Sequence, residues 1–173
     1  MGAPFAVEPL PPTALVVDDE PAICKLLATL LKTIGFESTL AASAEEALAI
    51  VETRPFACLI TDKNLPGMDG IDLVRAMRVA QPHCACIVVT GYASHDSAIE
   101  ALQLGASDYI EKPFHNSIVL ERVKRAVATA QATYELAALH AQAIELLRSA
   151  GKTVPEGGHG LAAALNAAFG LNV

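Results

Sequence analysis

The sequence predicts an α/β protein: a doubly wound, five-stranded parallel sheet with helices on both faces, plus a C-terminal helical extension. Three observations support this fold class. Short, continuous apolar runs alternate along the chain with stretches whose apolar residues recur every three or four positions. Continuous apolar strands indicate a sheet that is covered on both faces. The length of 173 residues suits one domain with a short appendage.

Five segments have the character of strands. Residues 14–17, 56–61 and 85–90 are continuous apolar runs of the kind found in buried strands. Residues 36–40 alternate apolar and polar side chains, and residues 108–110 form a short fifth strand. A helical stretch separates each strand from the next, so the strands are expected to run parallel.

The helical segments carry start and stop signals. Pro21 suits the first turn of the first helix, and Gly35 suits its end. Ser43 and Glu46 have the spacing of a capping box at the start of the second helix. Gly105 suits the end of the fourth helix. The helices are expected at residues 21–34, 44–53, 69–80, 96–104 and from 115 onward.

The last of these helices is expected to continue beyond the domain, because residues 119–150 contain no Gly or Pro. A glycine-rich linker and a short helix over residues 161–169 follow. The chain is thus expected to comprise an extended leader (1–12), a domain (13–130) and a helical extension with a short tail (131–173). Such an extension can pair two copies of the chain, dock a partner or pack back on the domain. Its two apolar stripes are Val123, Val127, Ala130, Tyr134, Ala137, Ala141 and Ile144, and Leu136, Leu139, Ala143 and Leu147.

Composition excludes several classes of protein. The net charge is −7, with 12 Lys and Arg against 19 Asp and Glu, which disfavours nucleic-acid binding unless the cations cluster. No uncharged stretch is apolar enough to span a membrane, and the N-terminus lacks the features of a secretory signal. We therefore expect a cytoplasmic protein with no membrane partner. The four cysteines are expected to be buried, reduced thiols: Cys24, Cys58, Cys84 and Cys86.

Acidic residues follow two of the predicted strands. Asp18 and Asp19 end the first strand and Asp62 ends the third, and these ends are neighbours in a doubly wound sheet. Three converging carboxylates, matched only by Lys112, call for a hard divalent cation such as Mg²⁺. The alternative is that Asp18 and Asp19 cap the next helix and that Asp62 is an ordinary turn residue.

Two further strand ends carry groups suited to phosphate. The Thr90 hydroxyl can donate a hydrogen bond to a phosphoryl oxygen, and the Lys112 ammonium can pair first with a carboxylate and then with an added phosphoryl group. Pro113 suits a fixed turn and a cis peptide bond. A carboxylate nucleophile, a metal, a hydroxyl and a cation together indicate phosphoryl transfer. A metabolic enzyme on the same fold is disfavoured, because no glycine-rich dinucleotide or P-loop fingerprint appears.

Four motifs lie at these strand ends in a set order. They are Asp18-Asp19-Glu20-Pro21, Asp62-x-x-Leu65-Pro66-Gly67-Met68-Asp69-Gly70, Thr90-Gly91, and Gly105-Ala106-x-Asp108-Tyr109-x-x-Lys112-Pro113-Phe114. Over about residues 13–130, the chain thereby resembles the CheY-like receiver domain of bacterial two-component response regulators, which has a flavodoxin-like fold. Each motif alone is weak, but the ordered set of four is highly specific.

The resemblance implies a role for each position. Asp62 would accept a phosphoryl group from a phosphohistidine on a sensor histidine kinase or a phosphotransfer protein. Asp19, Asp62 and the backbone carbonyl of Asn64 would ligate Mg²⁺, and Asp18 would act directly or through water. Lys112 would pair with Asp62 and then with the phosphoryl oxygens. The chain would be a switch rather than an enzyme, with catalysis limited to its own phosphorylation and dephosphorylation.

The resemblance also implies a switch pair. Thr90 would swing toward the phosphoryl group, and Tyr109 would turn into the space that Thr90 leaves. Together they would alter a partner-binding face formed by the fourth helix, the fifth strand and the fifth helix. Taken singly, Tyr109 could be a core aromatic residue with its hydroxyl at the rim, and Thr90 could be an ordinary strand former.

Two interpretations of the output stay open. The chain is either a stand-alone receiver or the receiver portion of a DNA-binding transcriptional regulator whose output domain is absent from this chain. Residues 131–173 have a net charge of 2 − 3 = −1 and no helix-turn-helix pattern, so nucleic-acid binding by this chain is disfavoured.

Overall fold

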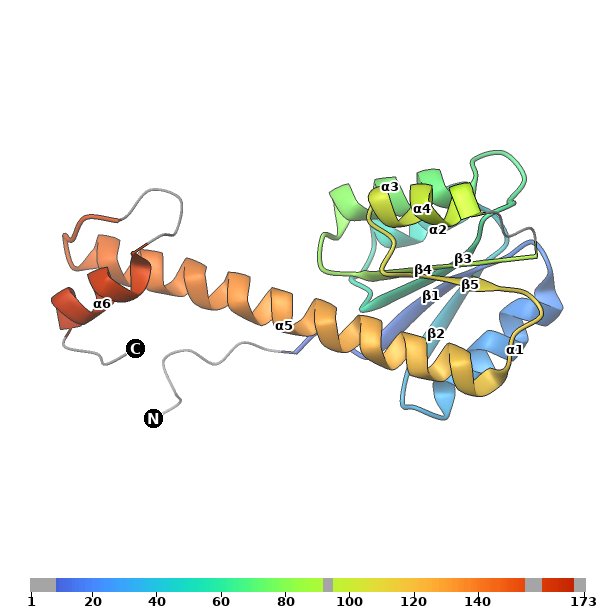
Figure 1. Ribbon diagram of the computed structural model, residues 1–173, viewed down its shortest axis with the longest axis horizontal. Helices are drawn as coiled ribbons and strands as arrows, with labels where there is room; N and C mark the ends of the chain where they lie inside the picture. Colours follow the sequence, from blue (N-terminus) through green and yellow to red (C-terminus); the bar gives the residue numbers. More distant parts are fainter. Residues whose placement is uncertain (1–8, 92–94, 155–159, 170–173) are drawn as a thin grey trace. The chain divides into compact units, whose positions relative to one another are not determined.

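The computed structural model describes residues 9–91, 95–154 and 160–169. Within these residues the strands form one five-stranded sheet in the order β2-β1-β3-β4-β5, and every neighbouring pair is parallel (Figure 1). The predicted doubly wound sheet is therefore confirmed. The strands are β1 (Thr13–Val17), β2 (Glu37–Ala41), β3 (Cys58–Asp62), β4 (Ala85–Thr90) and β5 (Asp108–Glu111).

Helices cover both faces of the sheet (Figure 1). Helices α2, α3 and α4 pack on one face, while α1 and the first part of α5 pack on the other. Among the described residues, none of the helices is both long enough and apolar enough to cross a membrane. The helices are α1 (Pro21–Lys32), α2 (Ala44–Val51), α3 (Gly70–Ala80), α4 (His95–Gln103), α5 (Asn116–Ser149) and α6 (Leu161–Phe169).

Strand β1 shows why the apolar runs are continuous. Leu15 and Val17 belong to the core on the α2–α4 side, whereas Ala14 and Val16 belong to the core on the α1–α5 side. All four residues are buried, because successive side chains of a strand point to opposite faces and both faces are covered here. The four cysteines are free and buried, as predicted.

The predicted helix start and stop signals lie at the ends of the observed helices. The Glu46 N–H donates to Ser43 Oγ at 3.2 Å, which confirms the cap on α2. Gly35 and Gly105, both with positive φ, follow the ends of α1 and α4. The element boundaries move by one or two residues. The third strand, for example, starts at Cys58 rather than at residue 56, because the Phe56 N–H donates to Gln81 Oε1 at 2.7 Å.

The chain divides into two compact units. One comprises Leu10–Gln131, and the described residues from Ala132 onward belong to the second. In the second unit, Ala143 and Leu147 of α5 pack with Leu161 of α6, and the short helix predicted over residues 161–169 is present. Residues 1–8 of the predicted leader and residues 155–159 of the predicted linker lie outside the described residues.

The first apolar stripe of α5 is only partly available to a partner. Val123 is fully buried in the core under the sheet, and Val127 and Ala130 pack against that core. The interpretation that the stripe packs back on the domain is therefore correct for this part of it. In the second stripe, Leu136 and Leu139 remain exposed by 56% and 38%.

Candidate functional site

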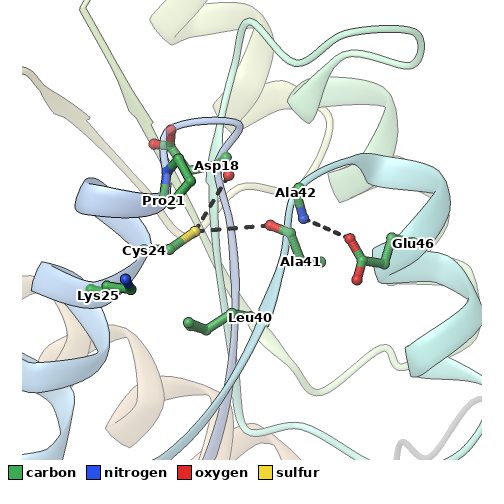
Figure 2. Close-up of a pocket in the computed structure, with 8 residues that line it drawn as sticks. All are labelled: Asp18, Pro21, Cys24, Lys25, Leu40, Ala41, Ala42 and Glu46. Atoms are coloured by element: carbon green, nitrogen blue, oxygen red, sulfur yellow. Dashed lines mark hydrogen bonds between the residues drawn. The ribbon is translucent and has the colours of Figure 1, made fainter.

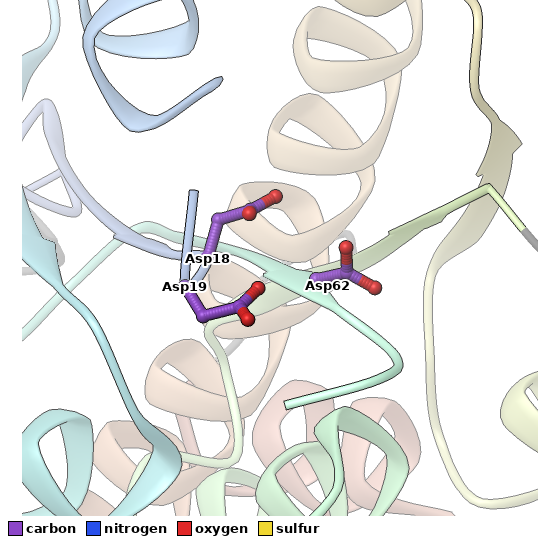
Figure 3. A group of neighbouring side chains, drawn as sticks. All are labelled: Asp18, Asp19 and Asp62. Carbon is purple, nitrogen blue, oxygen red and sulfur yellow. The ribbon is translucent and has the colours of Figure 1, made fainter. Parts of the chain in front are cut away.

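An acidic cluster lies at the carboxyl end of the sheet. Asp18 and Asp19 follow β1, and Asp62 is the last residue of β3. β1 and β3 are adjacent in the sheet, so their ends bring the three side chains together. One carboxylate oxygen from each residue lies within 4.8 Å of the others. Figure 3 shows the three side chains beside one another. Asp18 and Asp62 are buried, whereas Asp19 is exposed.

Lys112 pairs with both buried members of this cluster. Its Nζ lies 2.6 Å from Asp62 Oδ2 and 2.8 Å from Asp18 Oδ2. The exposed Glu20 carboxylate is 3.7 Å away. The Lys112 backbone N–H donates to the Thr90 carbonyl at 2.8 Å, and the following bond to Pro113 is cis. The predicted contact with Asp62 is therefore present, and Lys112 makes a second, slightly longer contact with Asp18 that the sequence did not indicate.

Burial and charge act against each other in this cluster. Burial raises the pKa of Asp18, and this effect outweighs the hydrogen bonds from Lys112 and the Glu20 N–H. Burial would lower the pKa of Lys112, but the hydrogen bonds to Asp18 and Asp62 outweigh burial and raise it. The lysine is therefore a firmly held cation, and its one ammonium pairs with the two buried carboxylates, Asp18 and Asp62.

The capping alternative for Asp18 and Asp19 is wrong. Helix α1 has Glu20 as its N-cap residue, and no side chain caps it. Asp18 Oδ1 instead accepts the N–H of Glu20 at 2.9 Å, which leaves Oδ2 for Lys112. The turn alternative for Asp62 holds in part, because its Oδ1 accepts the Asn64 N–H at 2.9 Å. Its Oδ2 nevertheless faces Lys112.

Thr90 and Tyr109 lie on two neighbouring strands, Thr90 at the end of β4 and Tyr109 within β5. Thr90 is the last residue of β4 and is fully buried. Tyr109 of β5 is half-buried, and its hydroxyl lies 3.0 Å from Ser97 Oγ, a buried group on α4. Sequence reasoning missed Ser97, because nothing in the motif spacing shows which helical residue would face the tyrosine. The tyrosine hydroxyl is thus tied to α4.

Comparison with known proteins decides the family. The family model for the response regulator receiver domain matches residues 14–124 of the chain. This chain is a response regulator receiver. Its family belongs to two-component signalling. Receiver domains bind Mg²⁺ at an acidic pocket, and they interact with histidine kinases or phosphotransfer proteins.

Several curated proteins resemble this receiver over the unit that contains the sheet, Leu10–Gln131. Chemotaxis protein CheY of Pseudomonas aeruginosa is 37% identical over 114 residues, which cover 64% of this chain and 92% of that protein. Transcriptional regulatory protein FixJ of Rhizobium meliloti is 37% identical over 66% of this chain and 56% of its own length. Response regulator protein FleR of P. aeruginosa is 38% identical, and the match spans 24% of its length. The receiver thus spans about a quarter of the length of relatives such as FleR.

Solved structures agree with this assignment. A CheY-like receiver domain protein from Methanospirillum hungatei superposes with a TM-score of 0.67 at 34% identity, covering 70% of this chain and 97% of that one. The solution structure of the beryllofluoride-activated NtrC4 receiver domain dimer gives a TM-score of 0.66 at 30% identity, with coverages of 69% and 98%.

The acidic cluster of this receiver fits the cation that its family binds. Asp18, Asp19 and Asp62 offer only oxygen donors, which Mg²⁺ prefers. Two of these carboxylates are buried with a single lysine between them, so a second positive charge would offset their remaining repulsion. Asn64, the fourth predicted ligand, stays beside Asp62 through its N–H.

A glycine shapes the loop that follows Asp62. The Gly70 N–H donates to the Lys63 carbonyl at 2.8 Å, which closes this loop at the start of α3. A Cβ at Gly70 would lie 1.9 Å from the Asp62 carbonyl oxygen, so only glycine fits. Asp69 then caps α3, since its side chain accepts the Asp72 N–H at 2.8 Å. The position of Asp62 therefore depends on the glycine eight residues later.

Two other features of the receiver are a cavity that borders Asp18 and an ion-pair group on β5. A mainly apolar cavity of about 220 Å³ lies between α1, β2 and α2, where the Cys24 thiol donates to the carbonyl oxygens of Asp18 and Ala41 (Figure 2). At the amino end of β5, the buried Asp108 pairs with Arg122 and Arg125 of α5. These arginines neutralise Asp108 and fasten α5 to the sheet.

Proposed function

We propose that this receiver takes a phosphoryl group on Asp62 from a phosphohistidine of a sensor histidine kinase or a phosphotransfer protein. The observation that carries the proposal is the contact of 2.6 Å between Asp62 Oδ2 and Lys112 Nζ within a cluster of three carboxylates. An Asp62 carboxylate oxygen would attack the phosphorus, and the P–N bond would break with its electron pair going to the imidazole. The product is an aspartyl phosphate.

Charge neutralisation is the main requirement of this transfer. Asp18, Asp19, Asp62 and the Asn64 carbonyl would hold Mg²⁺, which when bound offsets the negative charge of the phosphoryl oxygens. The Lys112 ammonium would exchange its contact with Asp62 Oδ2 for a contact with a phosphoryl oxygen. Lys112 would thus stabilise charge both before and after the transfer.

The same proposal assigns the output to the α4–β5–α5 face. Thr90 would respond to the phosphoryl group, and Tyr109 would follow. The contact of the Tyr109 hydroxyl with Ser97 supports this route, because it links β5 to α4 directly. Exposed apolar side chains on α4 and α5 supply a surface for a partner: Ile99, Leu102 and Ile118.

Intact mass spectrometry after incubation with Mg²⁺ and acetyl phosphate tests the acceptor. We expect a gain of about 80 Da in the wild-type chain and none in Asp62→Asn, which lacks the nucleophilic carboxylate. Asp72→Asn is the matched control, because Asp72 is an exposed carboxylate on α3 outside the cluster, and it should gain the same mass. An adduct that persists in Asp62→Asn, or none in the wild type with both acetyl phosphate and phosphoramidate, would contradict the proposal.

A second candidate is the receiver portion of a DNA-binding transcriptional regulator. The relatives named transcriptional regulatory proteins favour it, since the match spans 56% of the length of one FixJ protein and 57% of another. In this candidate, phosphorylation of Asp62 is unchanged and only the output differs. Binding of duplex DNA by this chain itself would not be expected, because residues 131–173 have a net charge of −1.

We also propose that the second unit pairs two copies of the chain through α5. Leu136 and Leu139 are exposed, and they continue the stripe that α6 covers at Ala143 and Leu147. Light scattering should therefore give the mass of a dimer for the wild type and that of a monomer for Leu136→Ser with Leu139→Ser. The paired change Leu26→Ser with Leu40→Ser, at exposed positions in the sheet domain, is the control and should leave the dimer intact. A monomeric wild type at high concentration would refute this pairing.

A further inference from the structure

The loop between β3 and α3 carries the groups that surround Asp62. Asn64, whose N–H donates to Asp62 Oδ1, lies at its start. The loop closes where the Gly70 N–H meets the Lys63 carbonyl. These contacts join the two ends of the loop, but neither of them holds its far side at Gly67 and Met68. A contact from another element is needed to place that part.

Glu45 of α2 makes that contact. Its Oε1 accepts the backbone N–H of Met68 at 3.1 Å, across 23 residues of sequence. The same oxygen lies 2.7 Å from the point that a Cβ on Gly67 would occupy. The carboxylate therefore rests directly on the Gly67–Met68 peptide, and the absence of a side chain at Gly67 makes room for it.

Helix α2 gives Glu45 a rigid base. Ala44 and Ala47 on either side of it are fully buried in the core beneath α2. Ser43 caps the helix, and the Glu46 carboxylate accepts the Ala42 N–H at 2.8 Å. The Glu45 backbone therefore cannot follow a displaced loop without breaking these contacts. Its side chain connects α2 to the loop at a fixed distance.

The charge of Glu45 suits this contact. Its own backbone N–H and that of Met68 donate to the carboxylate and hold the pKa of Glu45 below its ordinary value. Glu45 is thus ionised at neutral pH, and a hydrogen bond from an N–H to a carboxylate is stronger than one between neutral groups.

We propose that Glu45 is a positioning residue of the phosphorylation site: its carboxylate holds the loop of residues 63–69, and with it Asn64 and Asp62, in the arrangement that binds Mg²⁺. Glu45 does not touch Mg²⁺ or the phosphoryl group in this proposal. The link to Mg²⁺ rests on the proposed function, whereas the link to the loop rests on the contacts with Met68 and Gly67.

Amide exchange of the metal-free, full-length chain tests the first link. In Glu45→Ala the Met68 amide loses its acceptor and should exchange about tenfold faster, the effect of losing one such hydrogen bond. Glu45→Gln keeps an acceptor oxygen at the same reach and should stay within about twofold of the wild type. Glu52→Ala removes an exposed carboxylate from the end of the same helix and should leave Met68 unchanged. Unchanged exchange at Met68 in Glu45→Ala would overturn the proposal.

Calorimetric titration with Mg²⁺ tests the second link without any phosphorylation. We expect the dissociation constant to rise about tenfold in Glu45→Ala, the lower end of the range for residues that support metal ligands, and to be nearly restored in Glu45→Gln. Faster exchange at Met68 with unchanged Mg²⁺ affinity would show that Glu45 is only structural, and the positioning role would be wrong. If the wild type fails to take up a phosphoryl group, the proposed function fails, but both of these measurements still decide the role of Glu45.

Discussion

Replacing Lys112 with methionine is expected to lower the free energy of unfolding by about 3–5 kcal/mol at neutral pH without divalent cations. The Lys112 side chain is 14% exposed, and its ammonium contacts Asp18, whose side chain is 1% exposed, as well as Asp62. Methionine keeps the length of the side chain but leaves two buried carboxylates without a cation. Urea denaturation in the presence of a chelator measures the loss.

A matched variant and a metal titration sharpen this test. Lys25→Met makes the same change at an exposed position of α1 and should stay within about 0.5 kcal/mol of the wild type. Mg²⁺ should stabilise Lys112→Met more than it stabilises the wild type, since it is then the remaining counter-charge. Equal stability of Lys112→Met and wild type in the chelator would mean that the ammonium does not neutralise this cluster.

Replacing Gly70 with alanine is expected to disturb both stability and phosphorylation. The added Cβ would lie 1.9 Å from the Asp62 carbonyl oxygen and 2.8 Å from its carbonyl carbon, so the backbone itself must move. Overpacking of this kind costs about 3 kcal/mol. Because the displaced segment carries the nucleophile, we expect phosphorylation by acetyl phosphate to slow about 100-fold. Denaturation and the rate of mass gain measure the two effects.

Gly91→Ala is the control for stability at a second glycine of the same domain. Among the described residues, no atom outside its chain neighbours lies within 4 Å of the added Cβ, so this variant should unfold within about 0.5 kcal/mol of the wild type. Alanine has a higher helix propensity than glycine, so without a clash Gly70→Ala should not destabilise the start of α3. A Gly70→Ala protein as stable as the wild type would therefore show that the loop accommodates the added Cβ without strain. In that case Asp62 would not depend on the close approach at Gly70.

The sequence by itself determined the fold and where the candidate site should lie. Apolar periodicity marks which side chains must be buried, and this information is local, so the strands and helices could be predicted to within one or two residues. Asp18, Asp19, Asp62, Thr90 and Lys112 could be located because each stands at or just after the carboxyl end of a strand, and parallel strands bring such ends to one edge. The short helix over residues 161–169 followed from composition in the same way.

Only the tertiary structure decided which side chains meet. Lys112 bridges Asp18 and Asp62 across 94 and 50 residues of sequence, and no spacing rule shows that its ammonium reaches both. The contacts of Glu45 with Met68 and of Ser97 with Tyr109 likewise depend on how α2 and α4 lie on the sheet. The physical reason is that periodicity encodes the face on which a residue lies, whereas a hydrogen bond depends on the direction and reach of two side chains after packing.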